Sequence, residues 1–403
     1  LGLTPLDPRQ KTYLHTIQRS SATLFQLISD VLDVSKIESG QMAIESIEFC
    51  PLDMLEDTLH TYTAFAQRKG LQLYGCIDAQ LPDCVVGDPM RIRQILNNLL
   101  SNAVKFTDIG RVVIRARAVR RGDDRVDLEW QVTDSGVGIS QAQQAKLFDL
   151  FYQAPDTAGQ GGAGLGLPIC RWLAEMMDGQ IKVVSEPGLG SSFTLKMRLP
   201  LGTSELPGLT PIEPSTSPVY VQAPVRELAE SLCDWLNRLG IQATLAALPL
   251  EQQSAQAVLV DMLPAGPLQP WDGPRVLCVP GAHSPPLCTA QGWEVDMHDV
   301  RAIASVVALA QQGKQASALR VEQQSAGQLE LRILVAEDNP VNQEIIKEQL
   351  EALGCTVTLA DNGEQAMHLW QPQAFDLVLT DINMPLMNGY ELARTLREHD
   401  PQL

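Results

Sequence analysis

The chain has 403 residues, more than one hydrophobic core supports, so we expect several domains. Hydrophobic residues make up 45% of it and charged residues 19%, which excludes a wholly disordered chain. Its formal net charge of −18 argues against a nucleic-acid binder, because such a chain repels phosphate backbones.

The first predicted element is a long amphipathic helix from about Asp7 to Glu38. Prolines stand near its start and Gly40 ends it. One seam recurs at helical spacing and consists of Leu14, Ile17, Ser21, Leu24, Ile28, Val31 and Ser35. A lone helix cannot bury such a seam, so it needs a partner helix or a second chain, unless it lies on the following domain.

Mixed helix and strand follow, from about residue 44 to residue 199. The predicted elements are a helix at 51–69, a strand at 71–77, a helix at 88–106, a hairpin of 112–117 with 127–133, a helix at about 141–151, a glycine-rich loop, a helix to Met177 and two closing strands. This alternation predicts a domain of mixed α and β structure.

Three polar side chains share one face of the predicted helix at 88–106. Asn98, Asn102 and Lys105 are spaced by four and three residues. Two amides and an ammonium on one face can hold a magnesium ion and a triphosphate, with Lys105 as a point charge. A solvated polar face is the other interpretation of such a triplet.

Two glycine-containing segments extend this candidate nucleotide pocket. Asp134 ends a predicted strand and can accept the amino group of a purine, beside backbone that Gly136 and Gly138 leave open to a ligand. The loop at 159–167 opens a helix and has five glycines, whose N–H groups can cradle phosphates. It does not match the P-loop spacing. A plain turn and a flexible loop without a ligand are the respective alternatives.

In this order, and with the glycine turn at 188–193, the segments resemble the N, G1, F, G2 and G3 boxes of the histidine-kinase ATPase fold, which gyrase, Hsp90 and MutL share. The resemblance covers Gly87–Phe193. It implies that Asn102 coordinates Mg²⁺ and that Asn98 and Lys105 lie near the phosphates of ATP. The further ATP-binding residues that it implies are Asp134 with Gly136 and Gly138, the F-box residues Phe148 and Phe151, and the lid residues Gly162, Gly164, Leu165 and Gly166. The lid departs from the family at residues 158–160, Ala-Gly-Gln, where relatives often carry basic residues.

The helix ahead of the pocket selects one branch of that superfamily. Its end, Asp30–Gly40, resembles the second helix of the dimerisation and phosphotransfer hairpin of sensor histidine kinases. Two such hairpins form a four-helix bundle, which implies a homodimer. In the family the phosphoacceptor histidine lies in the first helix, in a Ser-His-Glu box that this sequence does not contain. His15 falls in the second helix, and we do not assign it that role.

A small βα domain is predicted at 219–312, between linkers at 201–218 and 313–329. It repeats the rhythm of a receiver without its chemistry, because Gln222 and Ala223 follow its first strand where acids would have to stand. Asp261 ends a strand, but one carboxylate is a poor metal site. We therefore interpret this domain as a degenerate, receiver-like spacer rather than an active second receiver.

Residues 330–403 begin a new series of strands and helices, and two of the strands end in acids. Glu337 and Asp338 follow one apolar strand, and Asp381 follows another. The carboxyl ends of parallel strands meet at one edge of a sheet, where three crowded carboxylates need a divalent cation such as Mg²⁺. A bound metal would stabilise a phosphoryl group moving onto one carboxylate, whereas acidic turns at two strand ends are the alternative.

This segment resembles the response-regulator receiver family. The resemblance implies that Asp381 is the phosphoacceptor, that Glu337 and Asp338 bind the metal, and that the backbone of Asn383 is a further metal ligand. The family's later Ser/Thr and Lys have no counterpart before residue 403, so the receiver is expected to be C-terminally incomplete.

We therefore expect a multidomain α/β protein. Its predicted parts are the second helix of a dimerisation hairpin (1–42), an α/β-sandwich histidine-kinase ATPase domain (43–200), the receiver-like α/β domain (219–312) and a flavodoxin-like receiver (330–403). This layout, with the segments at 73–78 and 87–91, is similar to that of the RcsC-type kinases of capsule phosphorelays.

The implied function is that of a hybrid sensor histidine kinase. It would autophosphorylate with ATP and Mg²⁺ on a histidine outside these residues and pass the phosphoryl group to Asp381. A downstream phosphotransfer protein or response regulator is the expected partner. A gyrase- or MutL-type ATPase is one alternative, and a kinase-like regulator that binds ATP without autokinase activity is another.

Cysteine usage and hydropathy address the compartment. Eight scattered cysteines without a Cys-x-x-Cys pair indicate reduced thiols rather than a zinc site or a disulfide framework. No apolar run approaches the roughly 20 residues that span a bilayer. Because the chain starts without Met and stops in mid-pattern, we expect the cytoplasmic portion of a protein anchored in the bacterial inner membrane through other segments.

Overall fold

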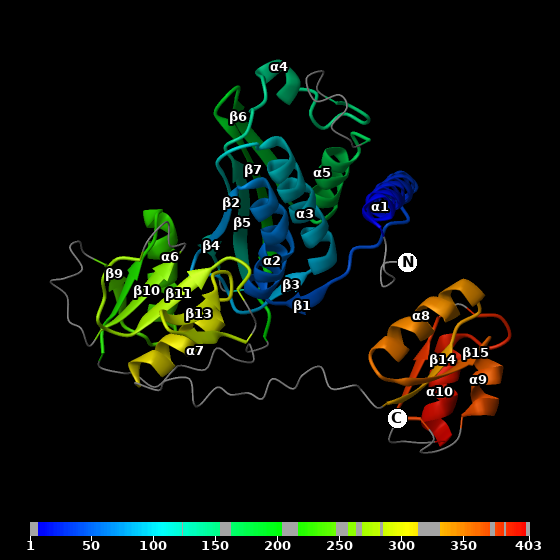
Figure 1. Cartoon of the computed structure of the whole chain (residues 1–403). Coiled ribbons are helices and arrows are strands. Elements are labelled where there is room, and N and C mark those ends of the chain that lie inside the picture. Colours follow the sequence, from blue (N-terminus) through cyan, green and yellow to red (C-terminus); the bar gives the residue numbers. More distant parts are fainter. Residues whose placement is uncertain are drawn as a thin grey trace. The chain divides into compact units, whose positions relative to one another are not determined.

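The computed structural model describes residues 7–122, 124–153, 163–203, 217–246, 257–262, 268–282, 285–312, 331–370, 375–382 and 384–399. The chain forms two compact units, residues 1–316 and 317–403, and each is described by itself (Figure 1). Among the described residues, no helix is long and apolar enough to span a bilayer.

Helix α1 (Pro8–Glu38) has a capping box at its start, as the sequence favours. Asp7 accepts the backbone N–H of Arg9 and of Gln10, and the Gln10 side chain accepts the N–H of Asp7. The last turns of α1 pack on the following domain through Val34 and Ile37. Large apolar side chains elsewhere on the helix are exposed, namely Tyr13, Ile17, Leu24, Phe25, Ile28, Val31 and Leu32.

The following domain is built on a five-stranded sheet in the order β2-β4-β5-β7-β6. Its strands are β2 (Gln72–Ile77), β4 (Arg111–Arg121), β5 (Arg125–Asp134), β6 (Gln180–Glu186) and β7 (Gly190–Pro200). Helices α2 (Pro51–Lys69), α3 (Pro89–Phe106) and α5 (Gly166–Met176) cover one face, with α3 against both of the others (Figure 1). Residues alternate in β5 because one set packs under these helices, namely Val126, Leu128, Trp130 and Val132.

The predicted helices at 51–69 and 88–106 match α2 and α3, whereas the helix expected at about 141–151 is wrong in length. Helix α4 spans only Gln141–Gln144, and turns continue to Phe151, which has φ 60°. Ser140 caps α4, and the chain continues in turns after Gln144 although Leu147, Phe148 and Phe151 are apolar and stand at helical spacing. The short antiparallel pair β1 (Ile47–Phe49) and β3 (Val85–Gly87) was not expected.

Residues 219–312, called the middle module below, form a second sheet in the order β12-β13-β11-β10-β8-β9. The strands are β8 (Val219–Gln222), β9 (Ala243–Leu245), β10 (Val258–Met262), β11 (Arg275–Val279), β12 (Leu287–Thr289) and β13 (Gly292–Asp296). All neighbours are parallel except β12 with β13. Without β12, the order is the 2-1-3-4-5 arrangement of flavodoxin-like folds. Helices α6 (Arg226–Arg238) and α7 (Val300–Gln311) share one hydrophobic core with the five-stranded sheet of the preceding domain.

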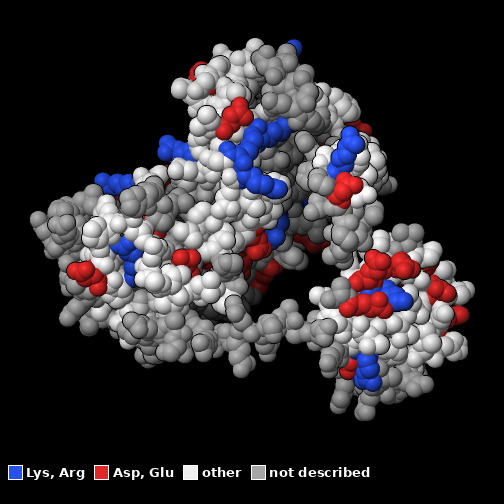
Figure 2. Space-filling view, in the orientation of Figure 1, with Lys and Arg blue, Asp and Glu red and all other residues white. Residues whose placement is uncertain are grey.

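The second unit has a three-stranded parallel sheet in the order β15-β14-β16. Its elements are β14 (Arg332–Ala336), α8 (Pro340–Ala352), β15 (Thr356–Ala360), α9 (Gly363–Leu369), β16 (Leu377–Thr380) and α10 (Gly389–His399). This is the predicted series of alternating strands and helices. Figure 2 shows acidic side chains gathered on this unit around a basic one.

Candidate nucleotide pocket and acidic cluster

A cavity of about 1120 Å³ opens between α3, α5 and the ends of β5 and β7. This is slightly more than the roughly 300–1,000 Å³ typical of small-molecule sites. The residues predicted from sequence that line it are Asn98, Asn102, Lys105, Asp134, Gly138, Gly164 and Gly166. Gly162 lies outside the described residues.

Helix α3 presents its polar face to this cavity because its apolar face is buried against the sheet. The buried positions are Ile92, Ile95, Leu96, Leu99, Leu100, Ala103 and Val104. On the other face, Asn102 Nδ2 donates to Asn98 Oδ1 at 3.0 Å, which leaves the side-chain carbonyl of Asn102 outside that bond. Burial lowers the pKa of Lys105. One helix therefore offers amide groups and an ammonium to a polyanionic ligand or its metal.

Asp134 lies at the end of β5, deep in the cavity. Its Oδ1 accepts the N–H of Gly136 at 2.8 Å and that of Ser191 at 3.3 Å. Burial raises the pKa of this carboxyl, and the two backbone N–H groups act in the opposite direction. Because both bonds use Oδ1, the carboxylate is held in one orientation and Oδ2 can accept a donor such as the amino group of a purine.

Glycines permit close backbone approach around this carboxylate. Gly138 has φ 72°, and a Cβ there would lie 2.0 Å from the carbonyl oxygen of Glu186. The loop after β5 therefore packs directly on the turn between β6 and β7. Gly136 and Leu165 do not line the cavity. Gly136 donates its backbone N–H to Asp134, and Leu165 is buried at the start of α5.

The predicted F-box residues do not line the cavity either. Phe148 lies under the guanidinium of Arg171, with 3.9 Å from Cζ to the ring centroid, and Phe151 is 68% exposed. Leu147 and Tyr152, which the sequence reasoning missed, line it instead. The reason is the early end of α4, because turns direct these side chains differently from a continuous helix.

Sequence reasoning also missed the contribution of α1. Ser29, Asp30 and Asp33 line the cavity. Asp33 is 9% exposed and accepts from Gln94 Nε2 at 2.8 Å, with Arg91 NH1 at 3.8 Å. The last turns of α1 thus form one wall of the pocket. No local pattern indicates this wall, because the contact between Asp33 and Gln94 joins residues 61 positions apart.

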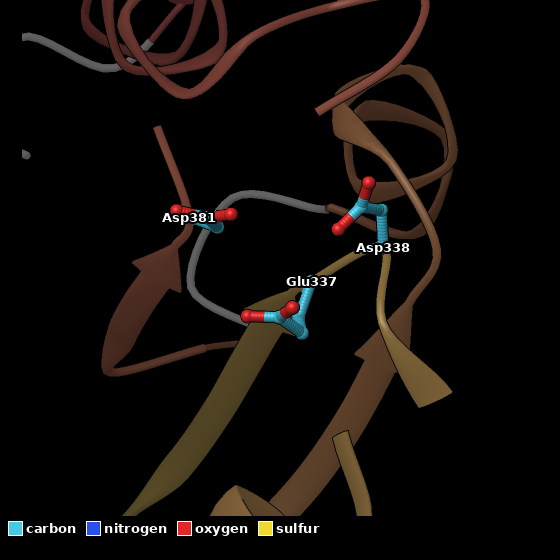
Figure 3. Close-up of side chains that lie close together, drawn as sticks. All are labelled: Glu337, Asp338 and Asp381. Carbon is cyan, nitrogen blue, oxygen red and sulfur yellow. The ribbon is translucent and has the colours of Figure 1, made fainter. Parts of the chain in front are cut away.

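Three acids come together in the second unit. One carboxylate oxygen of each of Glu337, Asp338 and Asp381 lies within 4.8 Å of the others (Figure 3). They follow β14 and β16, which are neighbours in the sheet, so their carboxyl ends meet as predicted. Glu337 is buried and accepts from Asn342 Nδ2 at 3.0 Å, while the other two are more accessible. Oxygen ligands in this number suit Mg²⁺; Asn383 lies outside the described residues.

The middle module does not reproduce this cluster. Asp261 is 6% exposed within β10, and burial raises the pKa of its carboxyl. Gln222 and Arg275 act in the opposite direction. No group of three metal-ligating side chains is found at that end of the module's sheet in the part of the chain that the structure describes.

Two known families match the two sites. Residues 87–201 match the family described as histidine kinase-, DNA gyrase B-, and HSP90-like ATPase, and residues 333–403 match the response regulator receiver domain. An ATPase domain of this type and a receiver in one chain are the domain composition of hybrid sensor histidine kinases. The chain shares this combination of an ATPase domain and a receiver domain with them.

Individual proteins similar to this chain are named as sensor histidine kinases. Sensor histidine kinase RcsC of Salmonella typhimurium is 35% identical over 392 residues, which cover 95% of this chain and 40% of the relative. Sensor histidine kinase GacS of Pseudomonas protegens is 33% identical over 443 residues, with coverage of 100% and 47%. The chain thus spans less than half the length of these relatives.

A solved structure is similar along the whole chain. It is the crystal structure of full-length ShkA in complex with AMPPNP, with a TM-score of 0.62 and 26% identity, and the likeness covers 98% of this chain and 84% of that one. The similarity therefore includes the middle module as well as the domains on either side of it.

Proposed function

We propose that this chain is the ATP-using and phosphoryl-relaying part of a hybrid sensor histidine kinase. It would transfer the γ-phosphoryl group of ATP to a histidine outside these residues and then to Asp381. The observation that carries the proposal is the single cavity that joins a buried carboxylate, Asp134, to the polar face of α3. A likeness to a protein solved with AMPPNP supports a nucleotide as the ligand.

In this proposal one end of the cavity binds adenine and the other binds the phosphates and their metal. Asp134 Oδ2 accepts the amino group of adenine, while Asn98 and Lys105 lie along the phosphates. The side-chain carbonyl of Asn102 would hold Mg²⁺, which offsets the phosphate charge when bound. The transfer itself then depends on positioning and electrostatics.

At the receiver, Glu337, Asp338 and the backbone of Asn383 would hold a second Mg²⁺ beside Asp381. A carboxylate oxygen of Asp381 attacks the phosphorus of phosphohistidine. A P–O bond forms as the P–N bond breaks, and the leaving imidazole keeps the electron pair. The buried position of Glu337 fixes one ligand before the reaction begins.

Partners and compartment follow from the same chemistry. The exposed apolar side chains of α1 would pair with a further helix and with a second copy of the chain in a helical bundle. Asp381 would supply a phosphotransfer protein or a response regulator. The domains would work in the cytoplasm, where ATP is available.

Titration with a fluorescent ATP analogue, with and without Mg²⁺, tests the pocket. Asp134→Asn should weaken binding about tenfold or more in both conditions, because its amide opposes the amino group of adenine with a donor. Asn102→Ala should weaken mainly the Mg²⁺-dependent part. Asp127→Asn is the matched control, since Asp127 lies on the same strand and faces Arg198, 3.5 Å away. Equal affinities in all four proteins would refute the site.

A further inference from the structure

The middle module contacts the ATPase domain with the edge at which α/β sheets usually bind ligands, the carboxyl ends of the strands. Beyond β11, the carbonyl oxygen of Pro280 accepts from Gln67 Nε2 of α2 at 2.9 Å. At the end of β13, Asp296 Oδ2 lies 3.8 Å from His60 Nδ1. At the start of α7, the N–H of Val300 donates to Glu56 Oε1 at 3.0 Å. Three points along this edge therefore lie against one helix.

The contacting residues of α2 occupy a single face of that helix. Glu56, His60 and Gln67 follow one another at intervals of four and seven residues, which return to the same side of a helix. On the module, the group opposite this face is buried and held in place. Asp296 is 6% exposed and accepts the N–H groups of Gly281 and His298. The cavity between the middle module and the ATPase domain measures about 20 Å³. This is room for a water molecule but not for a phosphoryl group and its metal.

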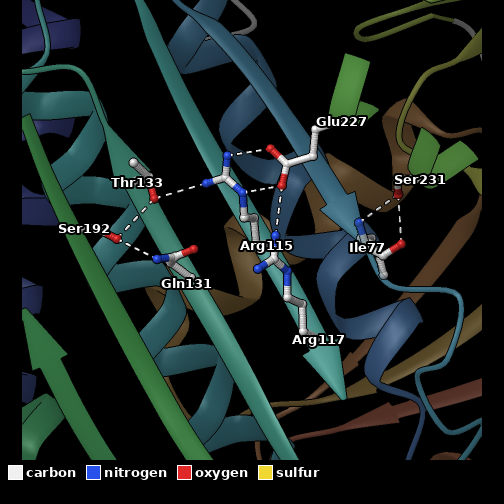
Figure 4. A network of polar contacts seen from close by, with 8 residues as sticks. All are labelled: Ile77, Arg115, Arg117, Gln131, Thr133, Ser192, Glu227 and Ser231. Carbon is white, nitrogen blue, oxygen red and sulfur yellow. Dashed lines mark hydrogen bonds and ion pairs between the residues drawn. The ribbon is translucent and has the colours of Figure 1, made fainter. Parts of the chain in front are cut away.

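A second set of contacts joins α6 to the other face of the ATPase sheet. Arg115 of β4 forms a two-pronged ion pair with Glu227, at 2.6 Å and 2.7 Å, and Arg117 joins at 3.1 Å (Figure 4). The Arg115 and Glu227 side chains are 19% and 35% exposed, so the pair is partly shielded from solvent.

The same helix forms hydrogen bonds with Ile77, the last residue of the edge strand β2. The carbonyl oxygen of Ile77 accepts from Trp235 Nε1 at 2.9 Å and from Ser231 Oγ at 2.8 Å, and its N–H donates to Ser231 at 3.0 Å. Arg238 then donates to the carbonyl oxygens of Ala79 and Leu81. Side chains of the module thus cover the end of this edge strand and the segment that follows it.

The Arg115 ion pair continues across the sheet toward the nucleotide pocket. Arg115 NH1 donates to Thr133 Oγ1 at 3.2 Å, and Thr133 Oγ1 lies 3.2 Å from Ser192 Oγ (Figure 4). Thr133 immediately precedes Asp134, and Ser191, the neighbour of Ser192, donates its N–H to that carboxylate. The chain of contacts that starts at Glu227 therefore ends at the residues that hold Asp134.

We propose that the middle module is an intramolecular docking partner of the ATPase domain, and that its docking is coupled to nucleotide binding. The carboxyl edge of its sheet takes the α2 helix in place of a ligand. The Glu227–Arg115 pair aligns β4, β5 and β7 where they hold Asp134, so a docked module favours the nucleotide-binding geometry and a bound nucleotide favours docking.

Hydrogen exchange measured by mass spectrometry on the whole chain tests the docking. Glu227→Gln removes the charge from the pair, and Trp235→Phe removes the donor to Ile77 but keeps an aromatic ring. Both should speed exchange of the β2 amides, by roughly tenfold for a docking weakened by one or two hydrogen bonds, and leave α3 unchanged. The control is Glu230→Gln, which alters the exposed Arg226–Glu230 pair one turn along α6. Unchanged exchange in β2 for both variants would overturn the docking.

Titration of the same proteins with a fluorescent ATP analogue tests the coupling. Glu227→Gln should weaken nucleotide binding by about two- to fivefold although it does not line the pocket, and Glu230→Gln should not. Saturating nucleotide should in turn slow exchange in β2 of the unaltered chain. Faster exchange in β2 with unaltered affinity would overturn the coupling. Asp134→Asn separates the two ideas, because at a nucleotide concentration that just saturates the unaltered chain it should reduce the nucleotide effect while the β2 amides stay protected.

Discussion

Gly166 offers a substitution that should separate nucleotide binding from folding. A Cβ at this position would lie 2.1 Å from Asn98 Nδ2 and 2.8 Å from Asn98 Oδ1. To reach even 3.0 Å, the amide nitrogen must move by 0.9 Å (3.0 minus 2.1), and the 3.0 Å bond from Asn102 to Asn98 would not survive that movement. Gly166→Ala therefore turns Asn98 away from the cavity.

The magnitudes differ for the two properties. Loss of the Asn98–Asn102 bond costs about 1 kcal/mol, and alanine at the first residue of α5 offsets only part of it, so the free energy of unfolding should fall by about 1 kcal/mol or less. A lost contact to a charged phosphate costs about 1.5 kcal/mol, which is roughly a tenfold weaker affinity for ATP.

Thermal unfolding and titration with an ATP analogue would be measured on Gly166→Ala and on the control Gly122→Ala. At Gly122 the nearest atom to a Cβ is the Arg125 carbonyl oxygen at 3.4 Å, an ordinary contact in a turn far along the hairpin. A melting temperature within a few degrees and a tenfold loss of affinity in the first variant alone are expected. An undiminished affinity would refute the reasoning that Asn98 must face the phosphates.

Two further predictions concern the receiver and the docking contact. In the full-length protein, Asp381→Ala should abolish labelling of the receiver by a phosphodonor with Mg²⁺ and Asp261→Ala should not, because among the described residues only Asp381 of the two has two further acids beside it; the reverse pattern would contradict the assignment. Burial raises the pKa of Glu56 to about 8, above an unfolded value near 4.5, so its ionisation opposes folding, and resistance to urea should fall as the pH rises from about 5 to 8. Glu56→Gln should flatten that slope, and an equal slope in both proteins would count against a buried, neutral Glu56.

The sequence predicted those parts of the fold that depend on local patterns. Helices α2 and α3 were expected within a residue of their ends, because proline and an N-cap start each and their apolar positions recur at helical spacing. The acids of the receiver were expected together because strand ends in a parallel sheet share an edge. Spacing placed Asn98, Asn102 and Lys105 on one helix face, and the family resemblance implied that this face lines a nucleotide pocket, which they do line.

What the sequence could not predict depends on contacts between distant segments. Phe148 and Phe151 were expected in the pocket, but α4 ends at Gln144 and Leu147 and Tyr152 line the cavity instead. The wall formed by Asp33 needs the last turns of α1 to meet Gln94, 61 positions away. The middle module was interpreted as a spacer, and the Glu227–Arg115 pair joins residues 112 positions apart, which no window of the sequence can relate.

The coverage of β2 by α6 has a consequence for how the protein can be divided. Tyr74 is 1% exposed and Val113 is 2% exposed, and both lie on the sheet face that α6 covers. A fragment that ends at Thr203 would expose this apolar patch together with the edge strand and would be prone to self-association by strand pairing. The smallest fragment that has the nucleotide pocket and stays monomeric is therefore expected to extend through α7. The boundary of the folding unit thus lies beyond the boundary of the nucleotide-binding sequence motifs.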